Sequence, residues 1–500
     1  MFPVPIKLVD KVLANALKFQ LYDGSGSEKR WSGYTTEPPN HESDLYAPFV
    51  TLVKSIAGLI PKSGATPNDV QWRDYHNTRP LSRDRYAADI RPDIVATIGV
   101  KDEQPVPWSR VVVPVEMKKQ VRDGPALLQL LKYMRMVFHE SMDRCFVLGI
   151  VVACTNMSVY LADRTGVLGS VVFNIHEKPE LLIRVIVGIC TLLPADLGWD
   201  TSMSVIREQQ KYSRSEVRRL KFERSYAVPW NPEKEDHYWV IDMPKQKEGA
   251  EYGVMDENKT ETFVLYKGLN VQRGEVIRGR ATRIWKAWLL DDLSLPQEDR
   301  PLFIVKDTWR DDERRLEGEF YAKIGRTPGV ATMRSYGVVY VGDQEDTVAS
   351  RIRRGLHVYA KPRCIDMAQK GFDPNTIPSS TPDRTRGNTT DYGSLIDYLP
   401  LIDVPERSPR GRTHSRLVME TYGWPIKMGL TLLETVQAMR DALVGHWTAF
   451  KMGVLHRDLS EGNILITGSK KVGFRGVIID MDYAKFSDDP TLAEDPISVR

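Results

Sequence analysis

This sequence of 500 residues has few cysteines and almost no excess of one sign of charge over the other. The four cysteines are Cys145, Cys154, Cys190 and Cys364, and none belongs to a Cys-x-x-Cys pair. This excludes a disulfide scaffold and argues against a structural zinc site. Lysine plus arginine number 69 and aspartate plus glutamate 66, so the formal net charge is only +3. Such a balance argues against a nucleic-acid coat protein and against a polybasic membrane protein.

The sequence also lacks a hydrophobic run long enough to cross a membrane. Its most apolar stretch, residues 181–193, contains Arg184 and falls short of the ~20 residues that a membrane helix needs. Residues 1–19 lack the apolar core and cleavage site of a secretory signal and are compatible with a short amphipathic helix. We therefore expect an intracellular protein, in the cytoplasm or the nucleus.

Composition divides the chain into three parts. We expect an α/β domain over residues 1–204, a charged linker over 205–258 and a second domain over 259–500. Residues 371–394 are rich in Pro, Gly, Ser, Thr, Asn and Asp, which predicts a disordered insert. Within the linker, residues 207–224 contain seven Lys or Arg against three Asp or Glu. This segment is compatible with a nucleic-acid contact, but a solvated basic helix is the simpler interpretation.

A catalytic-loop pattern stands near the carboxyl end, in residues 453–467 (GVLHRDLSEGNILIT). His456, Arg457 and Asp458, with Asn463 five residues after the aspartate, match the H-R-D-x-x-x-x-N pattern of protein kinases. We assign Asp458 and Arg457 as catalytic residues, with Asp458 accepting the proton of a substrate hydroxyl. Asn463 is then a magnesium ligand.

A second acidic residue follows a short apolar strand. Residues 464–466 and 477–479 are both predicted strands, and the second delivers Asp480 to the same side as the catalytic loop. Asp480 fits the D-F-G aspartate that binds magnesium, with Met481 and Asp482 in place of the Phe and the Gly. The combined spacing is much more specific than an isolated HRD; a polar turn between two strands is the alternative.

The nucleotide-binding lysine is expected upstream. A predicted strand over residues 302–305 ends at Lys306, in the position of the V-A-I-K lysine that binds the α and β phosphates. A predicted helix over 312–324 should supply its acidic partner. We choose Glu317, because the residues three, four and seven positions later are apolar and place it beside the buried face; Glu319 is the alternative. A lysine near an acidic surface helix is the plainer interpretation of the same pattern.

The segment 275–288 (EVIRGRATRIWKAW) occupies the position of a phosphate-covering loop. It contains one glycine, Gly279, where such loops usually have three. Backbone N–H groups between Gly279 and Thr282 can still approach phosphates, although less closely than in a glycine-rich loop. We therefore expect Gly279 and Thr282 to lie against the nucleotide, an expectation that rests only on their position in the sequence.

A hinge and a helix are predicted between the lysine strand and the catalytic loop. Residues 413–426 are predicted to form a strand that leads into a polar connection, and Met419 at its end is the expected adenine contact. Residues 431–453 carry apolar side chains at steps of three and four, which predicts an amphipathic helix. A helix that leads directly into the catalytic loop is the order expected of a kinase.

These segments together resemble the fungal-type protein kinase family. The resemblance rests on VIRGRAT, on IVKDTW followed by ERRLEGEF, on THSRLVMETYG, and most specifically on RDALVGHWTAFKMGVLHRDLSEGNILI with IIDMDYAK. It covers roughly residues 90–490, because RPDI and VPVEMKK also look like the region that accompanies this kinase domain. It implies an α+β protein with a bilobal kinase fold, the use of ATP with Mg²⁺, and phosphate transfer to Ser or Thr of a protein substrate.

Some features depart from the family pattern. Ser460 stands where most Ser/Thr kinases have a lysine that steadies the γ-phosphate, and DLSEGN with IID also resembles the atypical RIO-type kinases. The Asp480-x-Asp482 pair is similar to that of small-molecule phosphotransferases. An activation segment and a helical lobe of about a hundred residues usually follow, whereas 500 − 480 = 20 residues remain here. The expectation is a truncated carboxyl-terminal lobe, with a catalytically weak pseudokinase or scaffold and a small-molecule phosphotransferase as alternatives.

The first domain carries a different pattern. Asp93 precedes a predicted strand, and Glu116 and Lys118 lie on the next strand, VVVPVEMKK. This order resembles the PD-(D/E)xK nuclease-like fold, which implies two carboxylates that hold a divalent metal and a lysine that positions water. Gln129 and Tyr133 on a following helix fit the Q-x-x-x-Y arrangement of some members. The alternative is a solvated strand face with alternating charges, so a metal-dependent nuclease is one hypothesis of two for this domain.

Overall fold

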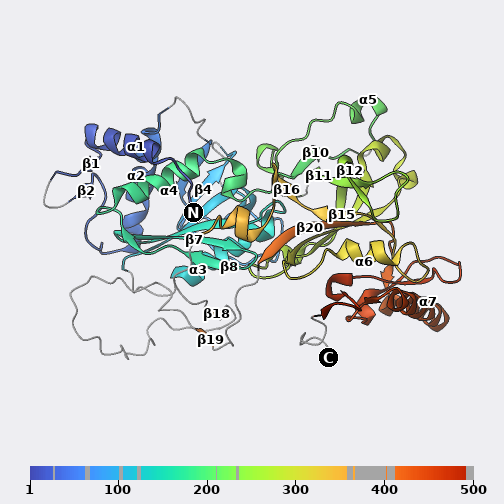
Figure 1. The fold of residues 1–500 in the computed structure, drawn as a ribbon. Helices are drawn as coiled ribbons and strands as arrows, with labels where there is room; N and C mark the ends of the chain where they lie inside the picture. Colours follow the sequence, from blue (N-terminus) through green and yellow to red (C-terminus); the bar gives the residue numbers. More distant parts are fainter. Residues whose placement is uncertain are drawn as a thin grey trace.

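The computed structural model describes residues 1–25, 29–61, 68–100, 105–120, 126–209, 211–231, 233, 236–356, 364–365, 401–402 and 411–490. The segment 371–394, predicted as a disordered insert, lies outside these ranges. Two large sheets lie side by side, the first on the left of Figure 1 in blue to cyan and the second on the right in green to orange. No described helix is long and apolar enough to cross a membrane.

The first sheet has the strand order β3-β4-β5-β6-β7-β8, with β9 paired to β7. Its strands are β3 (Val70–Asp74), β4 (Ile94–Ile98), β5 (Val111–Lys118), β6 (Val147–Ala153), β7 (Asn156–Asp163), β8 (Gly166–Gly169) and β9 (Phe173–Asn174). Only β5 and β6 run parallel, and α3 (Ala126–Glu140) connects them. A parallel pair needs such a crossover, whereas the neighbouring antiparallel pairs are joined without one.

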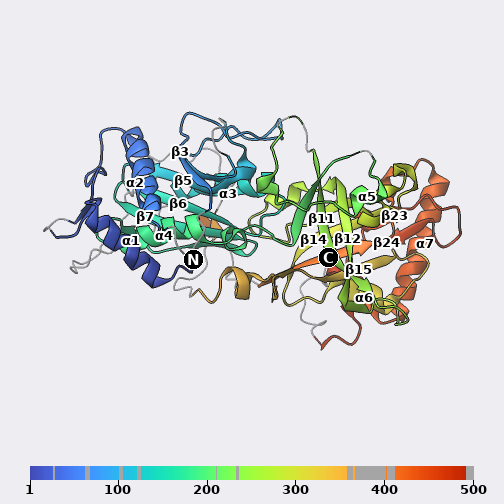
Figure 2. The ribbon, with the colours of Figure 1, turned by 90° about the horizontal axis from the view of Figure 1, so that it is seen from above.

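Helices cover both faces of this sheet. On one face lie α1 (Ile6–Lys18), α2 (Tyr46–Gly58) and α4 (Pro179–Thr191), and on the other lies α3 (Figures 1 and 2). All seven residues of β6 are buried, as expected of a strand covered on both sides. The amphipathic helix expected near the start of the chain is confirmed as α1, which buries Val9, Val12 and Ala16.

The second sheet has the order β10-β11-β12-β13-β14-β20-β15, and every neighbouring pair is antiparallel. Its strands are β10 (Met203–Arg207), β11 (His237–Gln246), β12 (Met255–Asn270), β13 (Arg283–Leu289), β14 (Phe303–Asp311), β15 (Met333–Val338) and β20 (Arg412–Met419). The short helix α6 (Glu317–Ile324) follows β14. This α+β arrangement agrees with the fold class expected from the sequence.

The charged segment 205–258 does not form the predicted linker throughout. Strands β10 and β11 belong to the second sheet, and only Arg214–Val217, labelled α5, is helical within the expected basic helix. The segment forms strands because Trp239, Ile241 and Met243 alternate along it and bury their apolar side chains in the core of the sheet, although the surrounding composition is charged. Where the two domains divide remains a prediction.

A smaller unit follows the second sheet. It contains the sheet β21-β23-β24, the pair β22-β25 and helix α7 (Leu432–Lys451). The strands are β21 (Trp424–Pro425), β22 (Val454–Leu455), β23 (Ile464–Ile466), β24 (Gly476–Ile478) and β25 (Lys485–Phe486). The predicted strand over 464–466 is therefore confirmed, and the one predicted over 477–479 begins and ends one residue earlier.

Helix α7 buries its small residues and exposes its large ones. Ala438, Ala442 and Gly445 are among its buried residues, and a Cβ on Gly445 would lie 2.2 Å from the backbone of Gly329. Only small side chains allow so close a backbone approach. The apolar residues that revealed the helix are exposed instead, namely Leu432, Val436, Met439, Leu443, Trp447 and Phe450. The prediction of a helix is confirmed, but the rest of the described protein packs against its small residues and leaves the face with the large apolar residues exposed.

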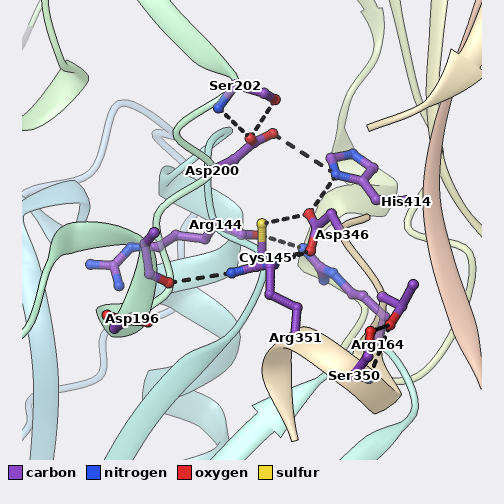
Figure 3. Close-up of polar contacts among 12 residues, drawn as sticks. Arg144, Cys145, Arg164, Asp196, Asp200, Ser202, Asp346, Ser350, Arg351 and His414 are labelled. Carbon is purple, nitrogen blue, oxygen red and sulfur yellow. Dashed lines mark hydrogen bonds and ion pairs between the residues drawn. The ribbon is translucent and has the colours of Figure 1, made fainter. Parts of the chain in front are cut away.

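A buried charge network links the second sheet to the first half of the chain, and Figure 3 shows its part around His414, Asp346 and Asp200. His414 on β20 contacts Asp346 through Nδ1 at 2.9 Å and Asp307 on β14 through Nε2 at 2.8 Å. Arg416 donates to Asp307 at 2.8 Å and reaches Asp200 of the first half of the chain at 2.7 Å. Burial alone would lower the pKa of His414, but the two carboxylates outweigh it and raise this pKa to about 9.

This network makes stability depend on pH. The pKa of His414 is 6.5 without the fold and about 9 within it, so its contribution is complete below pH 6.5 and is lost as the pH rises through 9. The pKa difference corresponds to about 3 kcal/mol. We expect the free energy of unfolding, measured by urea denaturation, to fall less steeply between pH 6.5 and 9 in His414→Gln than in the wild type. His41→Gln, a change at an exposed histidine, should leave the slope unchanged; equal slopes in all three proteins would contradict the assignment.

Candidate active site

A buried lysine lies at the centre of the carboxyl-terminal site. Lys306 is in the middle of β14, between β13 and β20, rather than at the strand end predicted from the sequence. Its Nζ lies 2.6 Å from Glu317 Oε2, 2.6 Å from Asp480 Oδ1 and 2.9 Å from Asp482 Oδ2. One ammonium group therefore holds three carboxylates that come from α6 and from the turn after β24.

The structure brings Glu317, rather than Glu319, to the lysine. Glu317 is the first residue of α6, and its second oxygen accepts a hydrogen bond from Met481 N at 3.0 Å. Glu319 faces elsewhere: it accepts from the backbone N–H of Leu316 at 3.2 Å and pairs with Arg315. The predicted helix over 312–324 begins only at Glu317, so the acid stands at a helix N-terminus, where negative charge is stabilised.

The charges of this cluster do not balance within it. Burial and the neighbouring carboxylates raise the pKa of Glu317 to about 8, although Lys306 opposes the shift. Burial works against ionisation of Asp482 too, but Lys306 and Arg280 outweigh it and lower its pKa. Three carboxylates face two cations, so the cluster has a negative excess that favours either a proton or an added cation.

The catalytic-loop residues contact one another and the residue that follows β24. Asn463 Nδ2 donates to the backbone oxygen of Asp458 at 2.8 Å and to its Oδ2 at 3.2 Å. His456 Nε2 contacts the oxygen of Ile479 at 2.9 Å, and its Nδ1 accepts from the backbone N–H of Asp458 at 3.3 Å. These contacts tie the loop to the end of β24, so the conformation of the loop and the position of Asp480 depend on one another.

Two backbone conformations mark the turns of the site. Arg457 has φ 65° and Asp480 has φ 67°, a region that side chains other than glycine rarely adopt. Such strain persists only where surrounding contacts hold it. At Asp480 those contacts are the ion pair with Lys306 and the backbone bond from Ile479 N to Asn463 O at 3.0 Å. Asn463 and Asp480 are thereby placed on one edge of the sheet, as the sequence predicted.

The single-glycine loop reaches the cluster through a side chain. Arg280 forms an ion pair with Asp482, and its backbone oxygen accepts from Trp309 N at 2.8 Å. The amide of Gly279 donates to Arg164 O at 3.0 Å, and Thr282 Oγ1 lies 3.0 Å from Thr308 Oγ1. Backbone approach to a phosphate at Gly279, expected from the sequence, therefore requires that amide to change partner.

Arg280 and Asp482 are the two site residues that sequence reasoning did not assign a role. The available signals were the arginines on either side of Gly279 and the alternation Asp480-x-Asp482. The expected hinge residue Met419 is the last residue of β20 and is 7% exposed, and it belongs to the same hydrophobic core cluster as Phe320 and Ile464. The next residue, Glu420, donates its amide to Thr332 O at 2.8 Å.

The oxygen donors suit a hard cation. Carboxylate oxygens of Glu317, Asp480 and Asp482 all lie within 4.8 Å of one another. Magnesium prefers one or two carboxylates together with phosphate oxygens and water. Because the amide nitrogen of Asn463 binds Asp458, its Oδ1 is the atom suited to a metal. Asp480 and Asp482 could therefore hold such a cation, and Asn463 as a second ligand beside Asp480 stays a prediction.

A second cluster lies in the first half of the chain. Lys118 Nζ is 2.7 Å from Glu116 Oε1 and 3.3 Å from Glu42 Oε1. Tyr133 on α3 donates to Glu116 Oε2 at 2.8 Å, and Asp93 Oδ2 accepts from Met117 N at 2.7 Å.

This second cluster contains the three residues expected together from the sequence, Asp93, Glu116 and Lys118. It also contains Glu42, which no sequence pattern predicted. Burial first, and Asp93 second, raise the pKa of Glu116 to about 8. Gln129 is one turn before Tyr133 on α3 and is partly exposed.

Comparison with known families decides the class of the protein. The family model described as fungal protein kinase matches residues 91–497. The chain belongs to the fungal protein kinase family. The match begins just before Asp93, so this fungal protein kinase region includes most of the first sheet as well as the second. A search of curated proteins found no match.

The Lys306–Glu317 contact in this fungal protein kinase predicts a difference between two neighbouring acids. Glu317→Gln keeps the shape, but its single amide oxygen cannot accept from both Lys306 Nζ and Met481 N as the carboxyl group does, so we expect MgATP affinity in isothermal titration calorimetry to fall about tenfold. Glu319→Gln, two residues away on the same helix, should bind MgATP as the wild type does. Equal affinities for both variants would contradict the role of Glu317.

Proposed function

We propose that this fungal protein kinase transfers the γ-phosphoryl group of MgATP to Ser or Thr hydroxyls of a protein substrate. The observation that carries the proposal is the burial of Lys306 among Glu317, Asp480 and Asp482, beside a loop in which Asn463 holds Asp458. Phosphoryl transfer requires mainly positioning and charge neutralisation, which is what such a constellation supplies. The second sheet with α6 would form the nucleotide lobe of a bilobal fold, and α7 with β22–β25 would begin the other lobe.

Each residue then has a separate task. Lys306 would bind the α and β phosphates, and Glu317 would hold the lysine in place. Asn463 and Asp480 would hold Mg²⁺, which neutralises phosphate charge when bound. Asp458 would accept the proton of the attacking hydroxyl, and Arg457 would support the turn that presents Asp458.

The nucleotide itself would be enclosed by the phosphate-covering loop and by the end of β20. Gly279 and Thr282 belong to the loop that would cover the phosphates, and Met419 marks the strand end near the adenine. Arg280 would exchange its partner Asp482 for phosphate oxygens, because a guanidinium group matches phosphate geometry. This side chain would replace contacts that a loop with three glycines makes through its backbone.

Two alternatives share the same residues. A pseudokinase or scaffold would bind MgATP without transferring phosphate, and a small-molecule phosphotransferase would use a sugar or aminoglycoside hydroxyl. Two residues support these alternatives: Ser460 stands in place of the usual lysine, and Asp482 is a second acid beside Asp480. The experiment therefore tests both alternatives as well.

The test measures transfer of radiolabelled phosphate to a protein mixture, with sugar and aminoglycoside acceptors alongside. We expect Lys306→Met and Asp458→Asn each to reduce transfer at least about a hundredfold, since each removes a group that acts on the reacting phosphate or hydroxyl. The exposed residues Lys323 and Asp488 provide matched controls, and Lys323→Met and Asp488→Asn should keep wild-type rates. Transfer that survives both site changes would reject the assignment.

We propose a second activity for the first half of the chain: divalent-metal-dependent hydrolysis of a phosphodiester in nucleic acid. Its support is the convergence of Asp93, the residue before β4, with Glu116 and Lys118 of β5, in the order α2-β3-β4-β5-α3-β6. Two carboxylates would hold the metal, which lowers the pKa of bound water, and Lys118 would position that water. Glu42 would add a third carboxylate.

Cleavage of plasmid DNA and of RNA in Mg²⁺ or Mn²⁺ tests this second proposal. Glu116→Gln should abolish cleavage and still fold, because glutamine has the shape of the protonated acid that the raised pKa favours. Glu177→Gln, at an exposed glutamate, is the matched control. If the wild-type protein cuts neither substrate with either metal, the nuclease hypothesis is rejected.

A further inference from the structure

The loop over the phosphate site is held from the first half of the chain. Arg164, in the turn between β7 and β8, is fully buried. Its Nη1 donates to Gly274 O at 2.9 Å and to Val276 O at 2.7 Å, and its own backbone oxygen accepts from Gly279 N at 3.0 Å. A single residue of the first sheet thus makes three hydrogen bonds to the segment between β12 and β13.

Arg164 is itself fixed on the side of the first sheet. Its Nη2 donates to Arg144 O at 3.0 Å, and its guanidinium lies 4.0 Å from the centre of the Phe138 ring on α3. Burial is the main cause that lowers its pKa, to about 9, so the group remains charged at neutral pH. Figure 3 shows Arg164 in the same close-up as Arg144, Asp346 and His414.

Helix α3 makes a second contact with the same loop. Arg135 pairs with Glu275 at 2.5 Å, and His139 Nδ1 lies 3.4 Å from the other oxygen of Glu275. Arg283, just after the loop, donates to the backbone oxygen of Met142. The segment is therefore held at its start by α3 and Arg164, and at its end by the residues that follow α3.

The far end of the loop lies in the candidate active site. Beyond Gly279, Arg280 pairs with Asp482, whose carboxylate also contacts Lys306. The amide held by Arg164 and the side chain that reaches the Lys306 cluster therefore belong to adjacent residues, Gly279 and Arg280. Movement of Gly279 would displace Arg280 directly.

We propose that Arg164 is a positioning residue for the nucleotide phosphates, through which the first half of the chain sets the conformation of the phosphate-covering loop. Arg164 touches no reacting group itself; it fixes the loop from which Arg280 acts. The inference rests on the proposed kinase function. It assigns to the first sheet a part in nucleotide binding that is separate from its own carboxylate cluster.

The test compares Arg164→Lys with Arg353→Lys. Lysine keeps the charge but not the fork that binds two backbone oxygens at once. Arg353 is a matched control, because it is also a largely buried arginine. Its partner is Asp163, at 2.7 Å, and this ion pair does not involve the phosphate-covering loop. For Arg164→Lys we expect an increase of about tenfold in KM for ATP, the effect of one lost charged hydrogen bond, with kcat changed less than about twofold.

Hydrogen exchange provides a readout independent of catalysis. Amides of residues 274–280 should exchange faster in Arg164→Lys than in the wild type without nucleotide, whereas Arg353→Lys should leave them unchanged. Faster exchange with an unchanged KM for ATP would overturn the inference, as would unchanged exchange.

The two proposals fail in different ways. A wild-type protein that does not bind MgATP would reject the proposed function and this inference with it. A wild type that binds MgATP, together with an Arg164→Lys variant of equal affinity, would reject the inference alone.

Discussion

The ammonium group of Lys306 is the contact on which the carboxyl-terminal half depends. It is buried among three carboxylates from two places that are distant in the sequence, one at the start of α6 and two in the turn after β24. Removing one partner of a buried ion pair leaves uncompensated charge, which is costly in a medium of low polarity. The cluster therefore holds the sheet, the helix and the β24 turn in one arrangement, and it also sustains the unusual backbone conformation of Asp480.

Strand β14 connects this cluster to the rest of the molecule. Successive side chains of a strand point to opposite faces, so Lys306 faces the carboxylate cluster while Asp307 faces His414 and Arg416. Through Arg416 the second network reaches Asp200 of the first half of the chain. Apolar contacts reinforce this junction, because Trp309 and Ala281 are packed in the core of the first half. The two sheets are thus joined at the strand that carries the lysine.

The sequence predicted the parts of the site that short spacing encodes. The interval from Asp458 to Asn463, the apolar strands around them and the choice of Glu317 over Glu319 all follow from local periodicity. Contacts between distant segments left no such signal: nothing in the spacing placed Arg280 on Asp482 or Glu42 beside Lys118. The charged composition of 205–258 concealed β10 and β11, because their alternating apolar residues are few and lie among many charges.

Helix α7 affects how the folded protein behaves with common probes. Its outward face carries Trp447, 55% exposed, beside Leu443, Val444 and Phe450, and Val436, Met439 and Trp447 line an open apolar groove. Dyes that fluoresce on exposed apolar surface bind such faces, and their signal is usually taken as the mark of a loosened state. None of the described residues covers this face, so the native fold itself would give that signal. Thermal unfolding of this protein is better followed by far-ultraviolet circular dichroism, because that signal reports secondary structure and does not depend on the exposed apolar face of α7.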